Sequence, residues 1–115
     1  MLPQSIRKNE DFKNVYYNGK KIVNKYFVFY YFKNNLGYDR IGFTVGTKIG
    51  KSAKRSHIKR RMREVFRLTY DQDFKGYDFI MVARNRMKNS EYNKVDKEFK
   101  KAFKKFRSQI KWIKY

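Results

Sequence analysis

A stripe of apolar residues near the end of the chain constrains the fold more than any other feature of the sequence. Six of them recur at helical spacing: Val95, Phe99, Ala102, Phe103, Phe106 and Ile110. Lysines occupy most of the positions between them, so the pattern predicts an amphipathic helix over residues 90–111. A lysine-rich helix could lie on anionic lipid, but the phenylalanine stripe favours burial in a protein core.

Three other segments are rich in β-branched and aromatic residues and predict strands. They are residues 21–33, 40–47 and 77–83, with an additional short strand near Ile22-Val23. Because side chains alternate along a strand, one face of the first segment carries Phe27, Phe29 and Tyr31. Its other face carries Tyr26, Val28, Tyr30 and Phe32. We interpret the first face as core. The second is either core or, together with Phe12 and Tyr16, a stacking platform for unpaired bases.

Two more helices complete the predicted elements. The first begins at Asn9, which suits an N-cap, and ends at Asn18-Gly19. One of its faces carries Phe12, Val15 and Tyr16. The second spans residues 52–70, and its apolar face carries Ile58, Met62, Val65, Phe66 and Thr69. The resulting order, α-β-β-β-α-β-α, predicts one α+β domain over residues 1–115, with the helices packed on a small sheet.

The formal net charge of +20 points to a class of partner rather than to a fold. A hydrophobic content of 41%, with 19% aromatic residues, excludes a disordered basic tail. Basic residues concentrate in KSAKRSHIKRRMREVFR, residues 51–67, where Glu64 is the only acidic residue. Solvated helix faces usually mix charges of both signs, so this segment indicates a polyanionic ligand. Nucleic acid is the main interpretation, and an anionic membrane surface is the alternative.

On a helical wheel, the polar residues of this segment fall opposite the apolar face or beside it. Opposite it lie Ser56, Lys59, Arg60, Arg63 and Arg67. Lys54 and Arg61 flank the apolar face on one side, and Arg55 flanks it on the other. The planar guanidinium of arginine suits bidentate contacts with phosphate, which strengthens the nucleic-acid interpretation.

Several catalytic chemistries lack the residues they need. GTKIGKS, residues 46–52, is one residue short of a nucleotide-binding P-loop, although the start of the following helix suits a phosphate beside Lys48 and Lys51. With a single histidine, His57, and no cysteine, a conventional zinc site cannot form. The lack of cysteine and of a signal-peptide pattern leads us to expect a cytoplasmic protein.

The segment VGTKIGKSAKRSHIKRRMRE, residues 45–64, resembles the motif of the bacterial ribonuclease P protein family. That motif is a strand and a lysine-rich loop followed by a helix with R-N-R-x-[IV]-K-R-x-x-R-E or a close variant. In the variant that lacks the x before [IV], the positions that match in register are Arg55, Lys59, Arg60, Arg63 and Glu64. RKNEDFKNVYYNGK, KYFVFYYF and YDFIMVAR resemble other elements of the family, so the likeness covers nearly the whole chain. Two positions depart from the motif, because Ser56 replaces the family's Asn and His57 replaces its second Arg.

The resemblance implies a subunit that binds a large catalytic RNA and the 5′ leader of precursor tRNA. The RNA, which requires Mg²⁺, performs the hydrolysis, and the protein is expected to carry no catalytic residue and to bind no cofactor. The fold implied is a four-stranded sheet with a left-handed βαβ crossover, against the usual right-handed rule. The residues expected at the catalytic RNA are Lys48, Lys51, Lys54, Arg55, Ser56, His57, Lys59, Arg60, Arg63 and Arg67. Those expected in the leader cleft are Phe12, Tyr16 and Tyr30.

Three other functions stay open on the sequence alone. A ribosome-associated or general RNA-binding protein would carry the same charge but would not prefer precursor to mature tRNA. A self-sufficient nuclease would need metal-binding carboxylates of its own. A nucleoid-type protein would bind duplex DNA.

Overall fold

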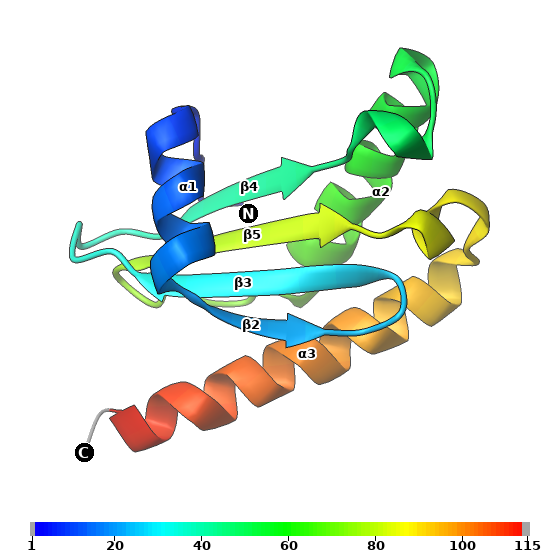
Figure 1. Ribbon diagram of the computed structural model, residues 1–115. Coiled ribbons are helices and arrows are strands. Elements are labelled where there is room, and N and C mark those ends of the chain that lie inside the picture. The colour runs from blue at the N-terminus through cyan, green and yellow to red at the C-terminus, as the bar shows by residue number, and fades with distance from the viewer. Residues whose placement is uncertain (1, 114–115) are drawn as a thin grey trace.

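A five-stranded mixed sheet and three α-helices make up the structure, a computed structural model that describes residues 2–113 of the chain (Figure 1). The first half contains β1 (Gln4–Ser5), α1 (Asn9–Asn18), β2 (Lys20–Val23), β3 (Phe27–Lys33) and β4 (Arg40–Thr44). The second half contains α2 (Ser52–Thr69), β5 (Tyr77–Ala83) and α3 (Tyr92–Ile113). Two short 3-10 helices, η1 (Thr47–Ile49) and η2 (Asn85–Asn89), precede α2 and α3.

The strands lie in the order β1-β4-β5-β3-β2. β3 is antiparallel to both β2 and β5, whereas β4 is parallel to both β1 and β5. In Figure 1, β4 lies above β5, both run toward the right, and α2 passes behind them. The β4–α2–β5 connection is therefore left-handed, which confirms the crossover that the resemblance implied.

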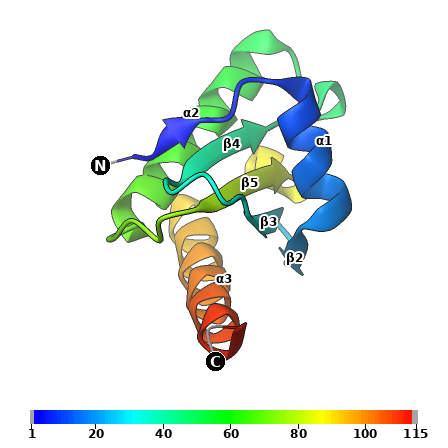
Figure 2. The same ribbon diagram turned by 90° about the vertical axis from the view of Figure 1, so that its left-hand side faces the viewer.

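The helices cover the two faces of the sheet unequally, as two perpendicular views show (Figure 1, Figure 2). α2 and α3 cover one face, where Phe27, Phe29 and Tyr31 of β3 are buried in the larger core. The predicted stripe of α3 lies in this core, with Ile110 at its margin. α1 alone covers the other face, over a smaller core of Ile6, Val15 and Ile80. The predicted assignment of Phe27, Phe29 and Tyr31 to the core is confirmed.

Three sequence predictions were wrong in detail. The sheet has a fifth strand, β1, whose two residues are too few to show a period. Tyr26 precedes β3 in the turn after β2, where Asn24 Oδ1 accepts hydrogen bonds from the backbone N–H of Tyr26 at 2.9 Å. The Tyr26 side chain is therefore buried in the larger core and does not share the face of Tyr30. Asn9 is the first residue of α1, and its N-cap is Lys8, which makes no side-chain capping bond.

Two buried carboxylates hold the loops at one end of the sheet. Asp78 accepts two hydrogen bonds from the Arg40 guanidinium, at 2.8 and 2.7 Å, and this pairing raises the pKa of Arg40. Asp39 accepts hydrogen bonds from the Tyr70 hydroxyl at 2.8 Å and from the backbone N–H groups of Phe74, Gly76 and Tyr77. Buried charges are retained when they are paired in this way, so both carboxylates have structural partners.

Candidate nucleic-acid interface

Three aromatic side chains meet between α1 and the sheet. Tyr16 of α1 contacts Tyr30 of β3 edge-on, with ring centroids 5.0 Å apart, and Phe12 lies one helical turn away at 6.3 Å from Tyr16. Tyr16 remains 36% exposed, whereas Phe12 and Tyr30 are half-buried. The structure thus brings together all three residues that were predicted for a leader cleft. Their rings offer edges and faces on which an unpaired base is able to stack.

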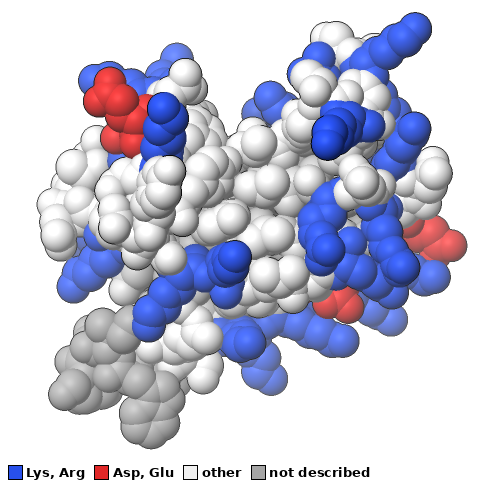
Figure 3. Space-filling view, viewed as in Figure 1, with Lys and Arg blue, Asp and Glu red and all other residues white. Residues whose placement is uncertain are grey.

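The cleft exists because α1 covers only part of its face of the sheet (Figure 1). Beyond the helix, Val28, Val82 and Thr44 are paired across neighbouring strands and are half-buried. Figure 3 shows a hollow between α1 and α2, with mostly uncharged side chains on its floor, Lys and Arg on the α2 side, and both acidic and basic side chains over α1. An uncharged floor beside a basic wall suits a strand whose bases point inward and whose phosphates point outward.

Two contacts fix the aromatic side chains in position. The hydroxyl groups of Tyr16 and Thr44 are hydrogen-bonded at 3.0 Å, and burial raises the pKa of Tyr16. Phe12 lies directly over Gly42, where an added Cβ would be 2.7 Å from Phe12 Cε1. The aromatic cluster is therefore preorganised, which lowers the entropic cost of binding a ligand to it.

The outer face of α2 is basic, as the helical wheel predicts. Every residue placed opposite the apolar face is exposed: Ser56, Lys59, Arg60, Arg63 and Arg67. The three flanking residues, Lys54, Arg55 and Arg61, are half-buried, and His57 is exposed. Ile58, Met62, Val65 and Phe66 are buried on the other side, while Thr69 is only half-buried. The predicted orientation of the helix is confirmed.

Contacts within the protein engage some of these cations. Arg67 donates two hydrogen bonds to Glu64, at 3.0 and 2.6 Å, and this lowers the pKa of Glu64. Arg63 lies over the ring of Phe43, with Cζ 5.5 Å from the centroid, and Arg61 donates a hydrogen bond to the Ser90 carbonyl. Arg63 is held by a ring face and its N–H groups stay available for phosphate, whereas Arg67 is already paired.

The loop before α2 adds two exposed lysines to this surface. Lys48 lies in η1, and Lys51 is the N-cap residue of α2 but makes no side-chain capping bond. The first turn of α2 contains no acidic residue. The positive end of the helix dipole and both lysines therefore lie at the same end of α2, where binding of a phosphate stays a prediction.

Comparison with known proteins identifies the family. The family model for ribonuclease P matches residues 3–107. The chain belongs to the ribonuclease P protein family. The ribonuclease P protein component of Thermoanaerobacter sp. (strain X514) is 40% identical over 96 residues, 84% of this chain and 83% of the relative. That of Clostridioides difficile (strain 630) is 37% identical over 103 residues, 89% and 90% of the two chains. The structure of the Staphylococcus aureus RNase P protein aligns with a TM-score of 0.77 at 30% sequence identity. The alignment covers 87% of this chain and 92% of the S. aureus chain.

The family model covers both the aromatic cleft and the basic face of α2, because residues 3–107 include α1, the sheet and α2. The contacts of individual residues with RNA stay predictions, including those at the two positions that depart from the motif. There Ser56 offers a hydroxyl and His57 an imidazole, where the motif has an amide and a guanidinium. Both side chains are exposed and so are accessible to a ligand.

Sequence reasoning missed two residues that shape the cleft. Thr44 holds the Tyr16 hydroxyl, and Gly42 gives Phe12 the space to lie on β4. A glycine inside a strand does signal close approach of another group, so Gly42 could have been found, but nothing in the sequence links Thr44 to Tyr16.

Within residues 2–113, no helix is long and apolar enough to cross a membrane, and no three His, Asp or Glu side chains gather where they could hold a metal ion.

Proposed function

We propose that this chain is the protein subunit of ribonuclease P and that it binds both the catalytic RNA and the 5′ leader of precursor tRNA. The basic face of α2, with Lys48 and Lys51, contacts the catalytic RNA. The cleft of Phe12, Tyr16 and Tyr30 holds the single-stranded leader. The RNA, with Mg²⁺, cleaves the phosphodiester bond, and the protein acts on substrate affinity in the cytoplasm.

One observation carries this proposal. In a chain of the ribonuclease P protein family, an open cluster of three aromatic side chains lies on the α1 face of the sheet, and α2 presents a one-sided basic face. Stacking on aromatic rings tolerates any base sequence, which suits leaders that differ from one precursor tRNA to the next. Arginine and lysine on a rigid helix suit the fixed phosphates of a folded RNA.

The division into two surfaces explains how the protein favours substrate over product. Precursor tRNA carries the leader and mature tRNA does not, so every contact in the aromatic cleft contributes to the difference in affinity. Stacking contributes about 1–3 kcal/mol per base, which corresponds to a preference of roughly 5-fold to 150-fold. The cations of α2 neutralise phosphates of the catalytic RNA, so the holoenzyme should need less Mg²⁺ than the RNA alone.

The test is cleavage of precursor tRNA at low Mg²⁺ by the protein alone, by a bacterial ribonuclease P RNA alone, and by the two together. We expect release of an intact 5′ leader only from the mixture. Cleavage by the protein alone would make it a self-sufficient nuclease. Equal cleavage by RNA with and without protein would instead leave a general RNA-binding protein, which is the alternative function.

A further inference from the structure

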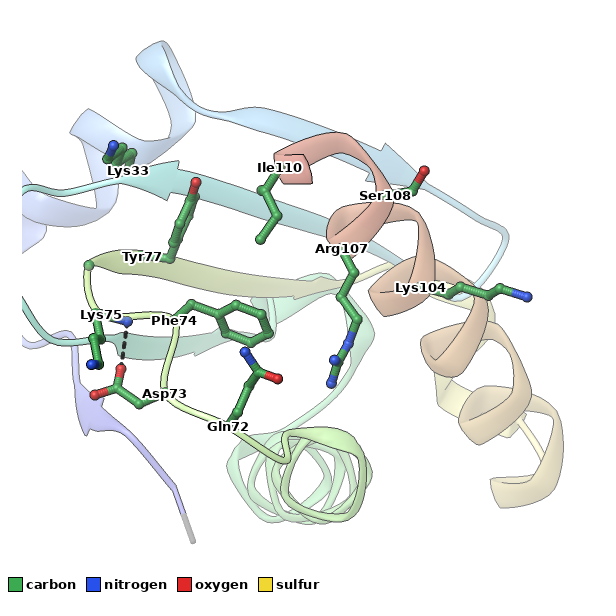
Figure 4. Close-up of a pocket in the computed structure, with 11 residues that line it drawn as sticks. Lys33, Gln72, Asp73, Phe74, Lys75, Tyr77, Lys104, Arg107, Ser108 and Ile110 are labelled. Atoms are coloured by element: carbon green, nitrogen blue, oxygen red, sulfur yellow. Dashed lines mark hydrogen bonds between the residues drawn. The ribbon is translucent and has the colours of Figure 1, made fainter. Parts of the chain in front are cut away.

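A second cavity lies on the opposite face of the sheet from the aromatic cleft. It has a volume of about 880 Å³ and lies between α3 and the loop that joins α2 to β5 (Figure 4). We call it the loop–α3 cavity and define it by Lys33, Phe74, Lys75, Tyr77, Lys104 and Arg107. A volume of this size is within the range of pockets that bind small organic ligands.

Two half-buried aromatic side chains form its apolar wall. Phe74 packs edge-on against Phe106, with centroids 5.1 Å apart, and Tyr77 packs edge-on against the same ring at 5.3 Å. Asp39 holds the loop at Phe74 and the start of β5 at Tyr77, because it accepts a hydrogen bond from the backbone N–H of Phe74 at 2.7 Å and from that of Tyr77 at 2.8 Å. The wall is therefore rigid before any ligand arrives.

Cations surround this wall. The Arg107 guanidinium extends from α3 toward Phe74, with Cζ 5.4 Å from the ring centroid, and also pairs with Asp71 (Figure 4). Lys33, Lys75 and Lys104 are exposed around the opening. The one carboxylate among the lining residues, Asp73, accepts a hydrogen bond from the backbone N–H of Lys75 at 2.8 Å and so is turned toward its own loop.

An apolar wall with an arginine beside it and lysines at the opening matches one kind of ligand. A nucleotide combines an aromatic base, which stacks on rings and on guanidinium planes, with a phosphate that needs cations farther out. We propose that the loop–α3 cavity binds an unpaired nucleotide, with its base against Phe74 and Tyr77 and its phosphate at Lys33 or Lys104. This site is separate from the leader cleft, because Phe74 and Tyr77 pack on the larger core and Tyr16 lies on the other face.

The test is a titration of the full-length, ¹⁵N-labelled protein, followed at the backbone amides of Phe74, Gly76 and Tyr77. The probes are adenosine 5′-monophosphate, a five-nucleotide adenosine RNA and a short polyglutamate peptide. We expect both nucleotide probes to shift these amides. If the two bind with equal affinity, a free nucleotide is the ligand, and if the RNA binds more tightly, a strand of RNA is. Tighter binding of polyglutamate than of either nucleotide probe would overturn the assignment, as would unshifted amides.

Matched variants separate this site from the general attraction of a basic protein for RNA. Lys33→Glu with Lys104→Glu should weaken binding about tenfold at these amides, since each lost phosphate contact lowers affinity. Lys97→Glu with Lys105→Glu makes the same charge change at exposed positions outside the cavity and should weaken it less than about twofold. Equal weakening by both pairs would overturn the proposal. Tyr77→Leu keeps an apolar side chain and should also weaken nucleotide binding, in a protein whose thermal midpoint shows that it is folded.

Discussion

Neighbouring residues of β3 show how differently the two faces of the sheet are used. Phe29 is fully buried, and its ring contacts Phe79 and Phe99 at centroid distances of 5.7 and 5.3 Å. Tyr30, the next residue, is half-buried and contacts the partly exposed Tyr16. The cause is the extent of helical cover, because α2 and α3, with 18 and 22 residues, cover one face and α1 covers the other with only 10.

This difference assigns most of the stability to one face and leader binding to the other. Over the sheet the α3 face is closed by interlocking phenylalanine rings, and its aromatic surface is open to a ligand only at the margin, in the loop–α3 cavity. The α1 face keeps a strip of half-buried side chains that a longer helix would have covered. A surface of this kind contributes less to folding, because less apolar area is removed from water, and it remains available for bases.

The largest expected effect is on the closed face. Phe29→Ala should lower the free energy of unfolding by about 3–5 kcal/mol, since it leaves a cavity among phenylalanine rings that are already tightly packed. Tyr30→Ala, one residue along the same strand, should cost less than half as much. Urea denaturation of both variants measures the difference. If the two losses were equal, the assignment of stability to one face would be wrong.

Gly42→Ala tests how α1 is seated on the open face. The new Cβ would lie 2.7 Å from Phe12 Cε1, so the ring must move, and we expect a loss of about 1–3 kcal/mol in the free energy of unfolding. Gly46→Ala is the matched control, because a Cβ at Gly46 meets nothing within 4 Å, and it should change stability by less than about 0.5 kcal/mol. A neutral Gly42→Ala would show that Phe12 is not fixed by this contact.

The binding role of the open face is tested by Tyr16→Ala. In the reconstituted holoenzyme, affinity for precursor tRNA should fall about tenfold, while affinity for mature tRNA should stay unchanged, because only the precursor has a leader to stack. Tyr17→Ala is the control, since Tyr17 is 85% exposed and takes no part in the ring contacts that join Phe12, Tyr16 and Tyr30. Parallel loss for both tRNAs would remove the leader from the cleft. The measurement is equilibrium binding of labelled tRNA at constant salt.

Much of this arrangement could be predicted from the sequence, because it depends on local periodicity. The stripe of α3 and the outward basic face of α2 follow from helical spacing, and the inward face of β3 follows from alternation. Periodicity failed where an element was short or ended early. β1 has only two residues, too few to show a period. β3 begins at Phe27, so the alternation along β3 does not extend to Tyr26.

The candidate site was predictable only as far as the motif and the strand pattern extend. Phe12, Tyr16 and Tyr30 were found by resemblance, and the structure brings them into contact. Contacts between distant segments carry no local pattern, so the bond of Tyr16 to Thr44 and the role of Asp39 in holding the loop before β5 could not be predicted. The loop–α3 cavity depends on the same long-range contacts and escaped prediction for the same reason.

The smallest expected effect separates the two faces by their tyrosines. Burial, together with the hydrogen bond to Asp39, raises the pKa of Tyr70 on the closed face. Burial also raises the pKa of Tyr16 on the open face, but the hydrogen bond between the hydroxyl groups of Tyr16 and Thr44 opposes the rise. A tyrosine whose pKa is higher in the folded than in the unfolded state stabilises the protein below the unfolded value, which is about 10, and this contribution is lost as the pH rises above it.

Stability should therefore fall between about pH 9.5 and pH 11, and the two tyrosines should account for different shares of the fall. Tyr70→Phe removes the larger shift and should make the decline with pH distinctly shallower, whereas Tyr16→Phe should change its slope only slightly. Lysines also titrate in this range, but they do so equally in both variants, so the comparison isolates the tyrosines. Urea denaturation at several pH values measures the slopes. A steeper dependence on Tyr16 than on Tyr70 would mean that the open face, rather than the closed one, holds its tyrosine more strongly in the neutral form.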